Sequence, residues 1–277
     1  MRQAGGRCTR RDFIGGTGLA VATAFLPPAL SFPGHTLVCV FLRGGADGLS
    51  LVVPHGDPRY RRARPTSAVP RVIDLDGYFG LHPGLEPLLA WWRHRQLLIA
   101  PAAGLPHRPA GHADAQSRID RWLSSRGAAR GVSWSHAARL IATPRRPAVT
   151  VIDVAGWDIH VDQGAATGLL AQRVHGLGRC LGRFVSDAGP RMRDVTVIVM
   201  SEFGRSVPEN ACGGTDHGHA GAVLAFGGAV RGGIRPWPGL AADSLPVRTG
   251  VYDLLDALAA PAGVTSRGWR LPLRPES

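Results

Sequence analysis

Two histidines and an aspartate lie close together in the glycine-rich segment CGGTDHGHAG, residues 212–221. These are Asp216, His217 and His219, and they follow shortly after Glu202, which comes directly after an apolar, strand-like run. An unpaired carboxylate at the end of a buried strand is costly, which favours a functional role for Glu202. Mixed carboxylate and imidazole side chains are typical ligands of zinc, manganese, iron or magnesium. The segment therefore indicates either a metal site or a polar surface turn.

Three more candidate ligands follow other apolar runs. Asp47 lies in RGGADG, and Asp158 and His160 lie in GWDIH, where a spacing of two can point both side chains to one face. Each has a structural alternative, with Asp47 as a turn or helix N-cap residue and the other two as caps of a following helix. We interpret His112 in AGHADAQ as the first residue of a helix rather than as a ligand.

The composition argues against several classes of function. The net charge is +12, but the chain has no lysine, its arginines are scattered and aromatic residues are only 6%. Aromatic side chains form the stacking platforms that hold single-stranded nucleic acid, so we predict no nucleic-acid partner. RGGADG lacks the spacing of a phosphate-binding loop, and no GxSxG motif supports a nucleophile elbow. The motifs therefore leave the catalytic residues unknown.

Apolar runs alternate with amphipathic segments along the chain. This alternation predicts a single α/β domain over residues 32–277, with a mostly parallel sheet sandwiched by helices. We predict strands over residues 36–43, 97–104, 148–154, 195–201 and 222–228, and helices over residues 85–96, 112–123, 168–187 and 251–260.

Polar clusters gather just after these strands, in segments such as 43–48, 155–160, 201–205 and 215–219. In sheets of this kind, functional groups collect beyond the carboxyl ends of the strands. We therefore expect one metal site at that edge, with ligands drawn from Asp47, Asp158, His160, Glu202, His217 and His219.

The first 31 residues resemble a twin-arginine export signal. The pair Arg10–Arg11 precedes the apolar run LAVATAFLPPAL, and Ala29 and Ser31 fit a small-residue cleavage site. Glycines and the pair Pro27–Pro28 leave fewer than the ~20 uninterrupted apolar residues that a spanning helix needs. We therefore expect the twin-arginine translocase as a partner during export, no stable transmembrane span, and a periplasmic or extracellular location.

Several longer blocks resemble the DUF1501 family. They are VFLRGGADGLSLVVPHGDPRYRRARP, GLHPGLEPLL, GHADAQ, GWDIHVDQ and VIVMSEFGRSVPENACGGTDHGHAGAVLAFGGAVRGG, in that order. The resemblance implies a fold like that of alkaline phosphatases and sulfatases, with a metal-bearing edge. It also implies metal-binding roles for Asp47, Asp158, His160 and Glu202, together with His217 or His219.

Two features depart from the family pattern. Family members carry Arg-Ser-His-Phe where this chain has Ala110, Gly111, His112 and Ala113. If that serine is the nucleophile, Gly111 cannot replace it. The chain is also shortened around residues 126–147.

Together these features predict an exported protein that resembles phosphate- and sulfate-ester hydrolases and uses a metal-activated water. The metal would be divalent, with zinc, manganese, iron, magnesium and calcium all open, and the substrate would be a small-molecule or polymer ester. Arg43 or Arg205 would clamp the substrate oxyanion. The alternative is a catalytically degenerate protein of the same fold that binds an envelope polymer or a partner.

Overall fold

The computed structural model describes residues 34–240 and 243–259, so the predicted export signal lies outside the described part. No helix within these ranges is long and apolar enough to cross a membrane. The central sheet has the strand order β10-β5-β8-β7-β1-β6, with β9 pairing to β5. Its strands are β1 (Thr36–Leu42), β5 (Leu97–Gly104), β6 (Val149–Val154), β7 (Val195–Ser201), β8 (Gly221–Gly227), β9 (Gly233–Ile234) and β10 (Thr249–Gly250).

Strand β8 runs against the direction of the other strands of this sheet. β1 is parallel to β6 and β7, and β5 is parallel to β9 and β10, whereas β8 is antiparallel to both β7 and β5. A parallel neighbour needs a crossover connection, and β8 follows β7 without a helix between them. The predicted α/β fold is confirmed, with a sheet that is mixed because of this one strand. Its likeness to alkaline phosphatases stays a prediction.

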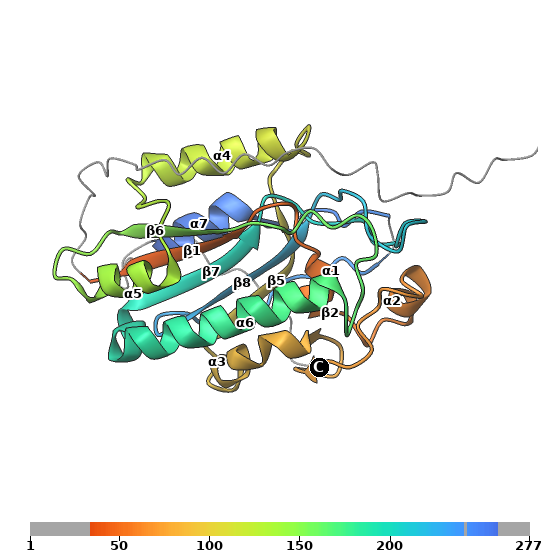
Figure 1. The fold of residues 1–277 in the computed structure, drawn as a ribbon, viewed down its shortest axis with the longest axis horizontal. Helices are drawn as coiled ribbons and strands as arrows, with labels where there is room; N and C mark the ends of the chain where they lie inside the picture. The colour runs from red at the N-terminus through yellow and green to blue at the C-terminus, as the bar shows by residue number, and fades with distance from the viewer. Residues whose placement is uncertain (1–33, 241–242, 260–277) are drawn as a thin grey trace, which may run out of the picture.

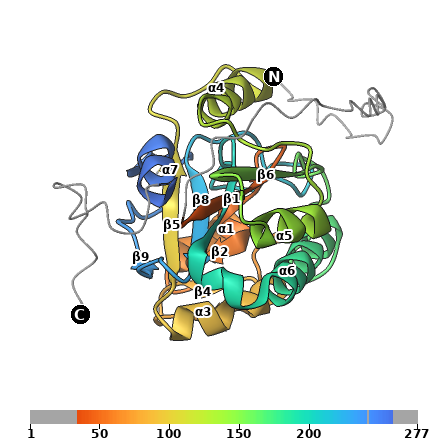
Figure 2. The ribbon, with the colours of Figure 1, turned by 90° about the vertical axis from the view of Figure 1, so that its left-hand side faces the viewer.

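Helices cover both faces of the sheet (Figures 1 and 2). One face packs against α4 (His112–Ser125) and α7 (Val251–Ala259), and the other against α5 (Trp134–Ala142) and α6 (Leu169–Ala188). Alternate residues of β1 enter the two cores: Cys39 and Phe41 face the first pair of helices, while Val38 and Val40 face the second. This burial on both sides explains why β1 is apolar throughout.

The helix predicted over residues 85–96 is two shorter pieces. A 3-10 helix, η2 (Pro83–Leu88), leads directly into α3 (Leu89–Arg93). Pro87 lies inside η2, and its ring and missing N–H prevent a continuous α-helix. The other predicted strands and helices are present with shifts of their ends.

Several short elements have no counterpart in the prediction. They include α5, the 3-10 helix η3 (Gly189–Asp194), and a small antiparallel sheet formed by β2 (Val52–Val53), β3 (Ile73–Asp74) and β4 (Gly80–Leu81). In the chain, α1 (Gly48–Leu51) directly precedes β2, and α2 (Pro58–Ala63) lies between β2 and β3. A two-residue strand is too short to show hydrophobic periodicity.

Three free cysteines lie in the described part of the chain, Cys39, Cys180 and Cys212. Cys39 is buried in β1, and burial raises the pKa of its thiol to about 12. Cys39 is therefore a core residue, as its place in an apolar strand predicts.

Candidate metal site

Loops from several strands meet at the carboxyl ends of β6 and β7. Because β8 runs in reverse, it starts where its neighbours end, which brings the loop before it to the same edge. That loop folds back on the end of β7: the N–H of Gly218 donates to the carbonyl of Gly204 at 2.8 Å, and the N–H of Ser206 donates to that of Asp216 at 2.8 Å. Residues far apart in the sequence therefore become neighbours at this edge.

His112, Asp158, His160 and His217 form one group of side chains, called the histidine–aspartate cluster below. Nε2 of His217 lies 3.0 Å from Nε2 of His112 and 3.1 Å from Nε2 of His160. Oδ1 of Asp158 lies 2.8 Å from Nε2 of His160 and 3.4 Å from Nε2 of both other histidines. The four side chains are 24–41% exposed, so solvent reaches the cluster.

Hydrogen bonding alone cannot satisfy these contacts. A ring nitrogen of a neutral histidine offers either one hydrogen or one lone pair. Nε2 of His217 has three ligand-type atoms within 3.4 Å, those of His112, His160 and Asp158. A cation bound among these nitrogen and oxygen atoms would accept their lone pairs and make the close contacts favourable. Ligand atoms of His112, Asp158 and His217 all lie within 4.8 Å of one another.

Glu202 holds His112 in a fixed orientation rather than joining the cluster. Its Oε1 lies 2.8 Å from Nδ1 of His112 and accepts hydrogen bonds from Gln116 Nε2 at 2.7 Å and the N–H of Gly44 at 2.9 Å. The carboxylate keeps the hydrogen of a neutral His112 ring on Nδ1, so the lone pair of Nε2 points into the cluster. Histidines that bind metals commonly have such a partner.

Neighbouring groups keep Glu202 and Asp158 ionised. Burial alone would raise the pKa of Glu202, but hydrogen bonds from Gln116, His112 and Gly44 bring it below its usual value. For Asp158, burial is likewise outweighed by the hydrogen bond and charge of Arg205, which lower the pKa.

His217 is kept in its neutral form. Burial lowers the pKa of its ring below the usual value, and this outweighs the raising effect of Asp158. Metal ions bind neutral imidazole, so His217 is in the form that a ligand needs.

Arg205 ties the loops of the site together. Its guanidinium is buried and donates to the carbonyls of Gly44, Gly45, Trp157 and Thr215. It also contacts two cluster members, with Nη2 2.6 Å from Oδ1 of Asp158 and Nη1 2.9 Å from Nε2 of His160. These six contacts use all five N–H donors of the Arg205 guanidinium, so Arg205 serves to hold the loops of the site.

Two glycines permit the close approach of backbone segments here. At Gly44, with φ +121°, an added Cβ would lie 2.4 Å from the backbone nitrogen of Asp158, and at Gly214 it would lie 2.3 Å from the backbone of His160. The site loops could not pack this closely with larger residues at these positions.

Three other predicted residues lie outside the cluster. The carboxylate of Asp47 is buried and paired with Arg64, with Oδ1 3.0 Å from Nη2. His219 contacts the carbonyl of Leu105 through Nε2 at 3.0 Å. Arg43 lies between Asp120 and Asp153 of neighbouring elements, at 2.9 and 2.7 Å.

The structure therefore brings together three of the six predicted ligands, Asp158, His160 and His217, and adds His112. His112 is the first residue of α4, as predicted, and it is also a cluster member. The signal that could have identified it is its position directly after the loop that follows β5, a strand that ends at the same edge as the other site loops.

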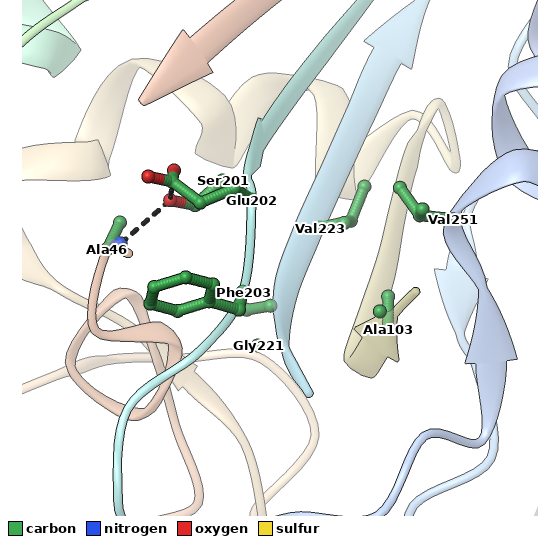
Figure 3. Close-up of a pocket in the computed structure, with 10 residues that line it drawn as sticks. Ala46, Ala103, Ser201, Glu202, Phe203, Gly221, Val223 and Val251 are labelled. Carbon is green, nitrogen blue, oxygen red and sulfur yellow. Dashed lines mark hydrogen bonds between the residues drawn. The ribbon is translucent and has the colours of Figure 1, made fainter. Parts of the chain in front are cut away.

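A small pocket lies beside the cluster, and its lining includes Glu202 and Phe203, which both contact His112 (Figure 3). Ser201 and Glu202 bound the pocket on one side, with Ser201 Oγ accepting from the N–H of Ala46 at 2.8 Å. Val223 and Val251 stand across from them. The ring of Phe203 packs against His112 and His217, with ring centroids 4.7 and 4.9 Å apart.

The model of the DUF1501 family, described as a protein of unknown function, matches residues 136–268. This segment contains Asp158, His160, Glu202 and His217, whereas His112 precedes it. No curated protein matches the chain.

Proposed function

This chain belongs to the DUF1501 family, and we propose that it binds a divalent metal ion through His112, Asp158 and His217. The observation that carries the proposal is that ligand atoms of these three side chains all lie within 4.8 Å of one another. The histidine rings also have too few N–H hydrogens to hydrogen-bond every close contact in the cluster. Ligands about 2.0–2.1 Å from a tetrahedral ion stand about 3.3 Å apart, and the separations of 3.0–3.4 Å in the cluster are close to that value.

The three ligands would leave a position open to solvent or substrate. His160 adjoins the group, but its Nε2 is shared between Asp158 and Arg205, so we assign it the role of aligning Asp158. Two neutral imidazoles and one carboxylate suit zinc, and also manganese or iron. Three protein ligands with an open position are typical of catalytic rather than structural zinc sites.

The reaction that we propose is hydrolysis of phosphate or sulfate esters in the periplasm or outside the cell. A bound divalent ion would supply Lewis-acid chemistry. Arg108 adds positive charge beside the cluster: it is exposed, and its Nη2 donates to the carbonyl of His217 at 3.2 Å. Such charge would attract an anionic ester. The twin-arginine signal and the resemblance to alkaline phosphatases support the proposal.

Replacing His217 tests the metal site, and replacing His219 provides the matched control. Both histidines belong to the same loop, but only His217 contacts the cluster in the described structure. We expect wild-type protein and His219→Ala to hold about one equivalent of metal by elemental analysis, and His217→Ala to hold less than about a tenth. Equal metal contents in the two variants, or a metal-free wild type after loading, would overturn the assignment.

The same variants test hydrolysis. Turnover of phosphate or sulfate monoesters by metal-loaded wild type and His219→Ala, but not by His217→Ala, is the expected result. Metal binding without any turnover would reject the hydrolase and favour the alternative below.

A catalytically degenerate binding protein is the second candidate, favoured by Gly111. This residue directly precedes His112, and its missing side chain leaves open space, since no atom lies within 4 Å of an added Cβ. The nearby hydroxyl of Ser201 is already engaged, donating to the carbonyl of Leu42 at 2.6 Å and lying 2.9 Å from Glu202. Position 111 therefore supplies no hydroxyl that could serve as a covalent nucleophile.

A further inference from the structure

Asn210, the only asparagine of the chain, lies in the loop between β7 and β8. Its side-chain oxygen, Oδ1, accepts hydrogen bonds from the N–H groups of Cys212 at 2.9 Å and Gly214 at 3.1 Å. Its side-chain nitrogen, Nδ2, donates to the carbonyl of His160 at 3.0 Å and to Oδ1 of Asp216 at 2.9 Å. These bonds use both hydrogens and both lone pairs of the amide group, so the orientation of the group is fixed.

The turn that begins at Asn210 does not require an amide. A side-chain oxygen that accepts from the N–H group two residues later closes such a turn, and aspartate supplies this oxygen as well as asparagine does. Elsewhere the chain uses aspartate: Oδ1 of Asp76 accepts from the N–H groups of the second and third residues after it, at 3.1 and 2.7 Å. What aspartate lacks is the NH2 group. The acceptors of that group, His160 and Asp216, therefore distinguish position 210 from an ordinary turn.

The NH2 group of Asn210 joins the two loops that carry Asp158 and His217. His160 lies two residues after Asp158 in the loop that follows β6, and Asp216 directly precedes His217 in the loop before β8. Backbone hydrogen bonds also join these loops, but they begin two residues beyond His160, farther along the chain from Asp158. The bond from Asn210 therefore holds one loop at the part of the other that carries the cluster residues.

We propose that Asn210 is a positioning residue of the metal site, and that its NH2 group holds Asp158 and His217 at the spacing that the ion requires. The inference rests on the metal site proposed above and assigns Asn210 no contact with the ion. Loops that are already aligned lose less conformational entropy when a ligand binds. Replacing a group that orients metal ligands commonly lowers the affinity for the metal about 10–100-fold.

Replacing Asn210 with Asp separates this role from the turn. The variant keeps the oxygen that closes the turn, but it places an oxygen instead of the NH2 group against the carbonyl of His160 and the carboxylate of Asp216. It also adds a negative charge near the site, and this charge alone would strengthen the binding of a cation. Loss of positioning and gain of charge therefore predict opposite changes in metal affinity.

Gln96→Glu is the matched control. Nε2 of Gln96 donates to the carbonyl of Gly228 at 3.3 Å, so this variant also loses an amide donor to a backbone carbonyl and gains the same charge. Gln96 directly precedes β5, whereas the cluster lies beyond the other ends of the parallel strands. The added charge is therefore farther from the cluster than in Asn210→Asp.

Titration of the metal-free full chain with zinc against a competing chelator measures the affinities. We expect Asn210→Asp to bind zinc about 10–100-fold more weakly than the wild type, and Gln96→Glu to bind within about threefold of it. Unchanged or tighter binding by Asn210→Asp would overturn the proposal while leaving the metal site in place. A wild type that binds no zinc would reject the metal site itself, and the positioning role with it.

Asn210→Ser keeps the test decisive if Asn210→Asp does not fold, which thermal unfolding of the metal-free protein identifies. A serine hydroxyl can also close the turn, but the side chain ends before the position of Nδ2 and adds no charge. We expect this variant to bind zinc about tenfold more weakly than the wild type. Affinity equal to that of the wild type would overturn the proposal.

Cobalt supplies a spectroscopic readout that a loss of stability alone would not change. The visible absorption of bound cobalt depends on the arrangement of ligands around the ion. At saturating cobalt, we expect a changed spectrum for the variants of Asn210 and the wild-type spectrum for Gln96→Glu. Wild-type spectra in all of them would show that Asn210 does not set the ligand geometry, and would overturn the proposal.

Discussion

Glu202 acts on the cluster through another side chain. It is 1% exposed, and its contact with Nδ1 of His112 sets the direction in which that ring presents its lone pair. Gln116, one helical turn after His112 on α4, donates to the same oxygen. Replacing a carboxylate that only orients a ligand should weaken metal binding less than replacing a carboxylate that binds the metal directly.

Replacing Glu202 with Gln distinguishes these two roles. The amide keeps the size of the side chain but removes the charge that holds the hydrogen on Nδ1 of His112. We expect zinc to bind about 10–100-fold more weakly, as for other residues that orient metal ligands. Titration of metal-free protein against a competing chelator gives the affinity. An unchanged affinity would refute the orienting role, and a loss as complete as that of His217→Ala would make Glu202 a ligand.

At the scale of single residues, the sequence predicted three of the four members of the cluster but not which loop histidine would join them. Asp158, His160 and His217 meet as expected, but His219, two residues from His217, contacts a backbone carbonyl instead. Loop geometry decides between them, and a spacing of two on a loop does not specify direction. His112 was not predicted as a cluster member, because a histidine at the start of a helix needs no further explanation in the sequence.

Among the elements, α2 and the turn after it clamp the loop that follows β7. Arg64, the residue after α2, is buried and donates to the carbonyls of Ser206 and Val207 at 2.7 and 2.9 Å. It also pairs with Asp47, which accepts a further hydrogen bond from Gln163 at 2.8 Å. Burial would raise the pKa of Asp47, but the charge and hydrogen bonds of Arg64 bring it below its usual value.

Replacing Arg64 with Met should destabilise the fold strongly. It would leave the carboxylate of Asp47 buried without its partner, which costs about 3–5 kcal/mol of the free energy of unfolding at pH 7. Arg61→Met, at an exposed position of the same helix, should change it by less than about 0.5 kcal/mol. Urea denaturation measures both variants. A loss below about 1 kcal/mol for Arg64→Met would show that the pair is unimportant for stability.

The pH dependence of this loss follows from the lowered pKa. In the wild type, the stability contributed by Asp47 is present above its unfolded pKa of about 3.9 and is lost as pH falls through the lower folded value. In Arg64→Met, Asp47 keeps its hydrogen bonds from Ser50 and Gln163 but loses the charge and hydrogen bonds of Arg64, so its folded pKa rises above the wild-type value. Protonation of Asp47 then removes the unpaired buried charge as the pH falls. The difference in free energy of unfolding between the variant and the wild type should therefore shrink toward pH 3.

Longer elements were predicted better than short ones for a physical reason. The buried strands are largely apolar runs of several residues and α6 has apolar residues at helical spacing, whereas β2, β3 and β4 are two residues each. The reversal of β8 was not predicted, because an apolar run has the same pattern in either direction. That reversal brings His217 to the end of β7.

At the scale of the whole molecule, metal binding should couple to global stability. The proposed ligands come from the start of α4, the loop after β6 and the loop before β8. A metal that binds the folded chain alone adds about 2.7 kcal/mol to the free energy of unfolding at a concentration 100 times its Kd. For a domain of this size the melting temperature should then rise by roughly 5–10 °C.

Thermal unfolding with and without zinc measures this coupling, and the His219→Ala variant should keep it while His217→Ala loses it. Bound metal by elemental analysis without any rise in melting temperature would place the ion outside the folded cluster.

Gly111 has a genetic consequence. Its backbone is extended, with φ 165°, and it stands next to a cluster histidine with room for a side chain. Glycine and serine codons can differ by one base, so a single mutation could place a hydroxyl beside the proposed metal site without rearranging the fold. A gene that encodes this chain would then be one base change from a site that contains a hydroxyl group.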